Sequence, residues 1–112
     1  MTHYMNWNKI TSTKDIDSII DSSERKKVII FKHSPSCYIS KMALRQFENE
    51  LKVDDAQTEL YFIDVINERP ISQAIASKLQ VHHESPQLLV LENKKVSFHR
   101  SHSSISASEL SV

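Results

Sequence analysis

The fold is decided by residues 28–40, which read VIIFKHSPSCYIS. The run Val28–Phe31 is apolar and mostly β-branched, which indicates a strand that is buried on both faces. The segment His33–Ser36 breaks this strand, and the residues from Cys37 to Leu51 are predicted to form a helix with apolar side chains at every fourth position. The stretch therefore predicts a buried strand, a short loop and a helix, the unit from which layered α/β domains are built.

The sequence on both sides of this unit repeats the alternation of helix and strand. Before it, a helix that Thr13 can cap carries Ile16, Ile19 and Ile20 on one face. After it, Pro70 is predicted to begin a helix whose apolar face ends at Leu79. The predicted strands of this half are 60–66, 88–91 and 96–99, the last two joined by a turn at 92–95.

The order of these elements predicts the architecture. Capping-box spacing from Ser106 to Glu109 suggests a short terminal helix, although the serine-rich residues 101–108 fit a frayed tail equally well. Helices that alternate with buried strands, followed by a hairpin, predict an α/β fold of three layers, an α/β/α sandwich around a mixed four-stranded sheet. We expect one domain over residues 1–112, because no linker or repeat interrupts the chain.

The composition excludes several classes of protein. The chain has 112 residues with no glycine, one cysteine, and 14 basic against 14 acidic residues. This charge balance argues against nonspecific nucleic-acid binding, the single cysteine excludes a scaffold of internal disulfides, and glycine-rich phosphate loops cannot form. No apolar run is long enough to span a membrane and no signal-peptide pattern is present, so we expect a cytoplasmic protein that does not bind membranes.

Cys37 has the clearest chemical potential. It is predicted to lie in the first turn of a helix with Ser36 as N-cap, where unpaired N–H groups and the helix dipole stabilise a thiolate. Ser40 lies one turn further and could donate a hydrogen bond to the sulfur, which makes a Cys-x-x-Ser motif without a resolving cysteine. A mixed disulfide on Cys37 would therefore need an external thiol to release it. The alternative is that Cys37 is a small buried apolar residue, and sequence spacing singles out no histidine, His33 included, as a protease base.

The dipeptide Ser85-Pro86 directly precedes a predicted buried strand. The residues alone favour an ordinary trans proline that starts the strand, because few X-Pro bonds are cis in folded proteins. The alternative is a cis bond that leaves a bare backbone edge beside the cysteine, where a partner chain can pair as an added strand.

Other polar residues are weaker candidates. The groups His82-His83-Glu84 and His99-x-x-His102 do not match zinc-site spacing, so we expect solvated histidines and no metal site. Asp64 is either a carboxyl that carries protons near the site or an edge residue pointing to water, and the second is favoured. Charges that could attract the carboxylates of a small acidic thiol are Lys32, Lys41 and Arg45, although exposed helix charges are the simpler interpretation.

From about Trp7 to its end, the chain resembles the monothiol bacilliredoxins of the YtxJ type, which are thioredoxin-like proteins of the bacillithiol system. The resemblance is carried by residues 31–40 (FKHSPSCYIS), 64–66 (DVI) with 69–72 (RPIS), 83–87 (HESPQ) and 101–102 (SH). This combination is specific, whereas a Cys-x-x-Ser motif alone is not.

The resemblance implies a thioredoxin-like fold and a cytoplasmic thiol–disulfide oxidoreductase that removes bacillithiol from S-bacillithiolated proteins. Cys37 would be the nucleophile, Ser40 would stand at the resolving position, and Pro86, preceded by Ser85, would be a cis proline beside it. Bacillithiol would act as co-substrate and regenerate Cys37. We also expect no bound cofactor and a monomeric protein. The alternatives are a non-catalytic thioredoxin-like binding module and a passive redox sensor.

The sequence departs from the family pattern at two places. Ser36 and Tyr38 replace the usual threonine and proline around the cysteine, and Tyr38 restores a backbone N–H that could bond the thiolate, while its ring could partly shield the sulfur. Glycines that are common in the family are replaced by Gln80 after the third helix and by Asn93-Lys94 in the hairpin. Asn93 is the candidate for a left-handed backbone conformation, and Gln80 is expected to be mildly strained.

Overall fold

The central feature of the computed structural model, which describes residues 7–51, 57–107 and 110, is a mixed five-stranded sheet. Its strands are β1 (Asn8–Lys9), β2 (Lys27–His33), β3 (Thr58–Asp64), β4 (Gln87–Glu92) and β5 (Lys95–Ser101). They lie in the order β1-β3-β2-β4-β5, where β1 and β2 pair with β3 in parallel and β4 pairs with β2 and β5 in antiparallel fashion. The predicted α/β class is confirmed, but the predicted number of strands, four, is wrong.

The additional strand is β1 at the edge of the sheet. Its two residues are both exposed, and Asn8 and Lys9 pair with Tyr61 and Phe62 of β3. A strand of two polar residues contains neither an apolar run nor an alternation of apolar and polar residues, so no sequence pattern predicts it. It forms because β3 offers unpaired backbone groups along that edge.

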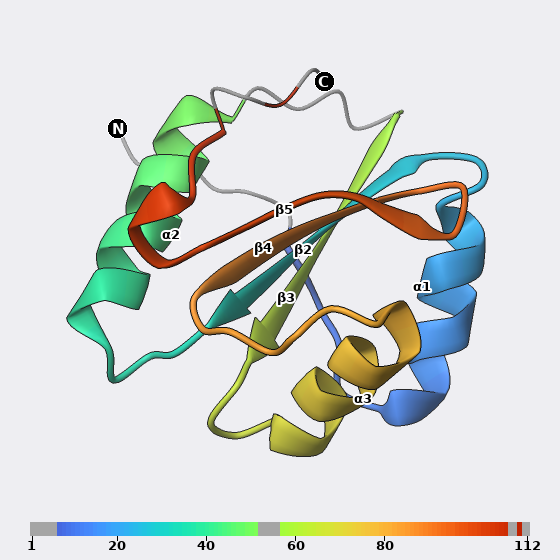
Figure 1. Ribbon diagram of the computed structural model, residues 1–112, viewed down its shortest axis with the longest axis horizontal. Helices are drawn as coiled ribbons and strands as arrows, with labels where there is room; N and C mark the ends of the chain where they lie inside the picture. The colour runs from blue at the N-terminus through green and yellow to red at the C-terminus, as the bar shows by residue number, and fades with distance from the viewer. Residues whose placement is uncertain (1–6, 52–56, 108–109, 111–112) are drawn as a thin grey trace.

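Helices cover both faces of the sheet. The elements are η1 (Thr13–Asp15), α1 (Ile16–Ser22), α2 (Tyr38–Glu50), α3 (Arg69–Leu79) and η2 (His102–Ser104). Figure 1 shows α2, in green, on one side of the sheet, and α1 and α3, in blue and yellow, on the other side. The three-layer arrangement is therefore the one predicted.

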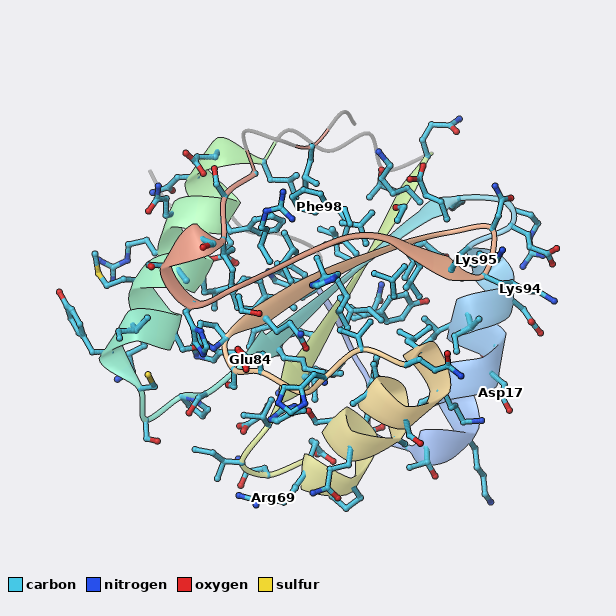
Figure 2. All side chains as sticks on the ribbon, viewed as in Figure 1. Asp17, Arg69, Glu84, Lys94, Lys95 and Phe98 are labelled. Atoms are coloured by element: carbon cyan, nitrogen blue, oxygen red, sulfur yellow. The ribbon has the colours of Figure 1, made fainter. Side chains whose placement is uncertain are left out.

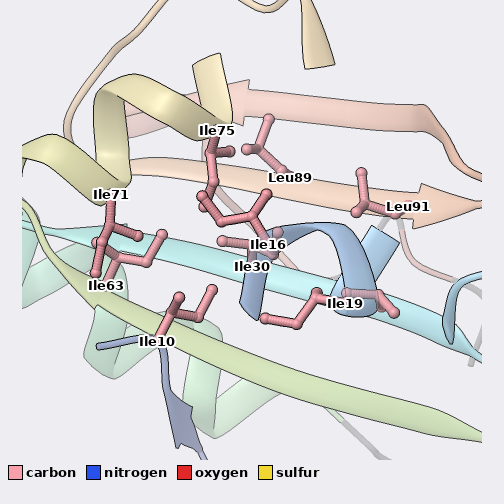
Figure 3. Packing of buried hydrophobic residues seen from close by; sticks show 10 residues of the cluster. Ile10, Ile16, Ile19, Ile30, Ile63, Ile71, Ile75, Leu89 and Leu91 are labelled. Atoms are coloured by element: carbon pink, nitrogen blue, oxygen red, sulfur yellow. The ribbon is translucent and has the colours of Figure 1, made fainter. Parts of the chain in front are cut away.

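The alternation of side chains along β2 connects the two layers of the core. Val28 and Ile30 pack into one cluster with residues of α1 and α3, while Ile29 and Phe31 pack into a second cluster with residues of α2. Figure 3 shows the first cluster, in which Ile71 of α3 lies beside Ile63 of β3 and Ile75 of α3 lies beside Leu89 of β4. Burial on both faces explains why residues Val28–Phe31 of β2 form an unbroken apolar run in the sequence.

Because the chain has no glycine, residues of other types adopt the positive φ angles at its helix ends and turns. Gln80 ends α3 in the left-handed region (φ 55°, ψ 42°), at the place where glycine is common in the family that the chain resembles. The hairpin between β4 and β5 turns at Asn93 and Lys94, with φ of 53° and 67°, the pattern of a type I′ turn. Ser12 is the N-cap of η1, because its side chain accepts from the backbone N–H of Lys14 at 3.1 Å. The N-cap of α1 is Asp15, so the prediction of Thr13 is wrong.

The end of the chain differs from the predicted helix. Residues 102–104 form the short helix η2, and residues 105–107 that follow are not helical. The predicted capping partner Glu109 lies outside the described residues, as do 108, 111 and 112.

Among the described residues, no helix has both the length and the apolar character that crossing a membrane requires.

Candidate active site

Cys37 lies between the end of β2 and the start of α2. It is the N-cap of this 13-residue helix, with extended backbone angles (φ −103°, ψ 123°), and its carbonyl accepts the first helical bond from Lys41 N–H at 3.1 Å. Its own N–H donates to the carbonyl of Ser34 at 3.1 Å, which closes the loop that precedes the helix. The predicted N-cap, Ser36, is therefore wrong by one residue, because the chain turns into helical geometry only after Cys37. The cysteine is free and partly exposed.

The backbone N–H groups of the first turn of α2 lie at the same end of the helix as Cys37. Lys41 is the first residue of α2 whose N–H has a carbonyl within the helix, so the N–H groups of Tyr38, Ile39 and Ser40 precede the hydrogen-bond ladder. The positive end of the helix dipole lies at the same place. In general, a negative charge at this end of a helix is favoured by both effects.

Ser40 does not have the partner predicted for it. Its hydroxyl oxygen accepts from the backbone N–H of Ser34 at 2.9 Å and lies 2.7 Å from Nδ1 of His33. Among the described residues, these two are its hydrogen-bond partners, and the side chain is completely buried. Ser40 thus joins the cysteine loop to the end of β2.

His33 is the residue of the site that the sequence interpretation missed. It is the last residue of β2, 9% exposed, and its ring lies 5.4 Å from the ring of Phe62 and 6.4 Å from that of Phe31. Burial lowers the pKa of His33, while the carboxylate of Asp64, its register partner on β3, opposes this shift. The alternation of β2 was the available signal: Ile29 and Phe31 face α2, so His33 must face α2 as well.

Lys32 faces the opposite side of the sheet. Its side chain has no exposed surface, and Nζ lies 3.1 Å from the carbonyl of Ser72 on α3 and 3.2 Å from Nδ1 of His83. Burial lowers the pKa of Lys32 to about 8. The interpretation of Lys32 as an exposed charge is therefore wrong, whereas Lys41 and Arg45 are exposed on α2.

Ser85 and Pro86 lie beside the end of β2. The Ser85-Pro86 bond is cis, as the resemblance implied and against the trans form that the residues alone favoured. Lys32 pairs with Gln87, so Pro86 comes beside His33, and the carbonyl of Pro86 accepts from the N–H of His102 at 3.0 Å. Ser85 Oγ is buried without a hydrogen-bond partner among the described residues. Figure 2 shows Glu84 of the same loop at the end of the sheet where α2 begins.

The surface next to Cys37 is apolar. Tyr38, Ile39 and Met42 are 74%, 54% and 45% exposed. They line a groove of about 200 Å³ between α2 and η2, where His102 of η2 and Ile105, which follows η2, form the other wall. The ring of Tyr38 therefore extends largely into solvent.

The remaining polar candidates have local roles. The carboxylate of Asp64 accepts from the backbone N–H groups of Ile66 and Asn67 and from the side chain of Asn67; although burial works in the opposite direction, these bonds lower its pKa. These bonds join the end of β3 to the turn that follows it. Nδ1 of His102 lies 3.5 Å from Oε2 of Glu84, and within residues 7–51, 57–107 and 110 no three histidine, cysteine or acidic side chains gather as metal ligands would.

Comparisons with known proteins agree with this geometry. A family model described as monothiol bacilliredoxin BrxC matches residues 8–110. A solved structure of a protein with a thioredoxin fold is 36% identical, with a TM-score of 0.75, and the match covers 89% of this chain and 86% of that one. Thioredoxin from Malassezia sympodialis (17% identity, TM-score 0.65, 92% and 88% covered) and oxidised thioredoxin from Plasmodium falciparum (20%, 0.65, 91% and 90%) share the fold.

Proposed function

Because this chain belongs to the monothiol bacilliredoxin family and has the thiol redox role of a thioredoxin-like oxidoreductase, we propose that it removes bacillithiol from S-bacillithiolated proteins. One observation carries the proposal: the only cysteine of the chain is the partly exposed N-cap of a long helix. A sulfur in this position has N–H groups and a helix dipole that favour its ionised form, which is the form that attacks disulfides.

The reaction consists of two thiol–disulfide exchanges. In the first, the Cys37 thiolate attacks the bacillithiol sulfur of the mixed disulfide, the protein–bacillithiol S–S bond breaks, and the protein leaves as a thiolate that takes a proton from water. In the second, the thiolate of free bacillithiol attacks the bacillithiol sulfur held by Cys37. Bacillithiol disulfide forms, the Cys37 thiolate is restored, and no electron is gained or lost overall.

The surroundings of Cys37 suit these substrates. The apolar side chains of Tyr38, Ile39 and Met42 offer a surface to the protein part of the mixed disulfide. The exposed cations Lys41 and Arg45 lie on the same helix and can attract the carboxylates of bacillithiol. Ser85 and Pro86 bring backbone groups beside the end of β2, where an extended substrate segment could pair.

The test uses a single-cysteine peptide that carries bacillithiol as a mixed disulfide. We expect mass spectrometry to find a bacillithiol adduct on Cys37 and, with excess free bacillithiol, release of peptide thiol over many turnovers. Cys37→Ser is the matched control, since it keeps a small polar side chain but cannot form a disulfide, and it should lose the activity. Release by Cys37→Ser at the parent rate would refute the proposal.

Two other outcomes would identify the alternatives. An adduct on Cys37 that excess bacillithiol does not remove would indicate a passive redox sensor. Tight binding of the peptide without an adduct would indicate a binding module that has no turnover.

A further inference from the structure

The Ser40 hydroxyl has more possible partners than protons. It can donate one hydrogen bond and accept two, and the backbone N–H of Ser34 already uses one acceptor position at 2.9 Å. The 2.7 Å contact with Nδ1 of His33 uses either the second acceptor position or the only proton. Because Ser40 is completely buried, no water competes for that proton.

Cys37 lies one helical turn before Ser40, and among the described residues no hydrogen bond joins its sulfur to this hydroxyl in the structure. It stands at the N-cap of α2 and Ser40 at the third helical position, and side chains at these two positions are neighbours in helices. A hydroxyl proton that is not given to His33 can therefore be given to the sulfur. The state of Nδ1 decides between these two arrangements, since an unprotonated Nδ1 accepts the proton and a protonated Nδ1 donates its own.

We propose that His33 is a positioning residue that acts through Ser40 on Cys37: its uncharged ring holds the Ser40 hydroxyl proton away from the sulfur, and its protonation releases that proton to the thiolate. No bond to His33 itself changes during the exchange reaction. The proposal rests on the proposed function only in taking Cys37 as the reacting sulfur.

The environment of His33 suits this role. Burial lowers the pKa of His33, which favours the uncharged ring, and in the tautomer that carries its proton on Nε2 the Nδ1 atom accepts the Ser40 proton. The charged groups that face it are Asp64 and Glu48, which raise its pKa, and Lys41, which lowers it. On its other sides lie the rings of Phe31 and Phe62.

The test measures the rate at which iodoacetamide alkylates Cys37 as a function of pH, which needs no bacillithiol. His33→Phe keeps an aromatic ring against its neighbours and frees the Ser40 proton permanently. Near pH 7 we expect this variant to react a few-fold faster than the parent, because a hydrogen bond from Ser40 favours the thiolate, while a stabilised thiolate is also a weaker nucleophile. The parent should show a second titration step at acidic pH that His33→Phe lacks.

Ser40→Ala separates the proposed role from a merely structural one. Without the hydroxyl, replacing His33 should have no further effect, so Ser40→Ala and the double variant should give the same pH profile. Equal profiles for the parent and His33→Phe, or slower reaction of His33→Phe near pH 7, would overturn the proposal.

A measurement on the parent protein covers the case in which His33→Phe does not fold. Long-range proton–nitrogen NMR correlations report which ring nitrogen of His33 carries the proton. Near pH 7.5 we expect Nδ1 to be unprotonated and Nε2 to carry the proton. A proton on Nδ1 at that pH would refute the mechanism. Neither result affects the debacillithiolation assay, which is scored on transfer of bacillithiol to Cys37.

Discussion

Replacing Lys32 by methionine removes a buried charge from the centre of the sheet. Methionine keeps the unbranched shape and the approximate length of the side chain. The two hydrogen-bond partners of the ammonium are the carbonyl of Ser72 and Nδ1 of His83, and no hydrogen bond among the described residues joins it to a carboxylate. The folded protein therefore bears the cost of desolvating a charge, and it bears that cost only where Lys32 is protonated.

The size of this cost follows from the pKa of Lys32, which burial lowers from 10.5 to about 8. A difference of about 2.5 units corresponds to about 3 kcal/mol of free energy of unfolding. Below about pH 8 the lysine is charged in both states and the folded state bears the whole cost. Between about pH 8 and 10.5 the unfolded chain binds more protons than the folded one, so the stability of the parent rises with pH.

Urea denaturation of both proteins at two pH values measures the effect. From about pH 7 to about pH 9.5 the free energy of unfolding of the parent should rise by about 2 kcal/mol relative to that of Lys32→Met. Comparing the two proteins cancels groups that titrate in both, such as Tyr61, whose pKa is raised by burial and by Glu59. In addition, because the Lys32 charge helps to lower the pKa of His83, Lys32→Met should raise it in an NMR titration. An unchanged stability difference between the two pH values would show that Lys32 is not desolvated.

Two further predictions concern the packing and the backbone. Phe47, with no exposed surface, anchors α2 to the sheet, so Phe47→Ala should lower the free energy of unfolding by about 3–5 kcal/mol in urea denaturation, and Phe47→Leu by clearly less. Gln80 has a left-handed backbone, so Gln80→Gly should raise the melting temperature through about 0.5–1 kcal/mol of relieved strain, whereas Ser77→Gly within the same helix should lower it. Equal effects of the two glycines would mean that the backbone of Gln80 is unstrained.

Much of the fold could be predicted because it depends on patterns of neighbouring residues. The apolar run Val28–Phe31 has the composition of a strand covered on both sides, and it lies at the centre of the sheet. Asn93 tolerates a positive φ better than most residues, and the chain turns there. The strand β1 could not be predicted, since its pairing depends on a free edge of β3, about fifty residues away in the chain.

The candidate site also has one part that the sequence predicts and another part that depends on the tertiary structure. The position of Cys37 at the beginning of a helix is local, and the strand–loop–helix sequence determined it to within one residue. The conformation of the loop brings Ser40 to His33, and the packing of α3 and of the loop before β4 encloses Lys32.

The sequence by itself therefore determined which elements form and where the reactive sulfur stands among them. Only the tertiary structure decided what surrounds the adjacent residues Lys32 and His33. Lys32 contacts Ser72 of α3 on one face of the sheet, and His33 contacts Ser40 of α2 on the other face. The physical reason is that a strand sends successive side chains to opposite faces, while the charge state of each side chain depends on the layer that covers it. The partners of Lys32 are Ser72 and His83, which lie 40 and 51 positions away in the chain. The partner of His33 is Ser40, which lies only 7 positions away.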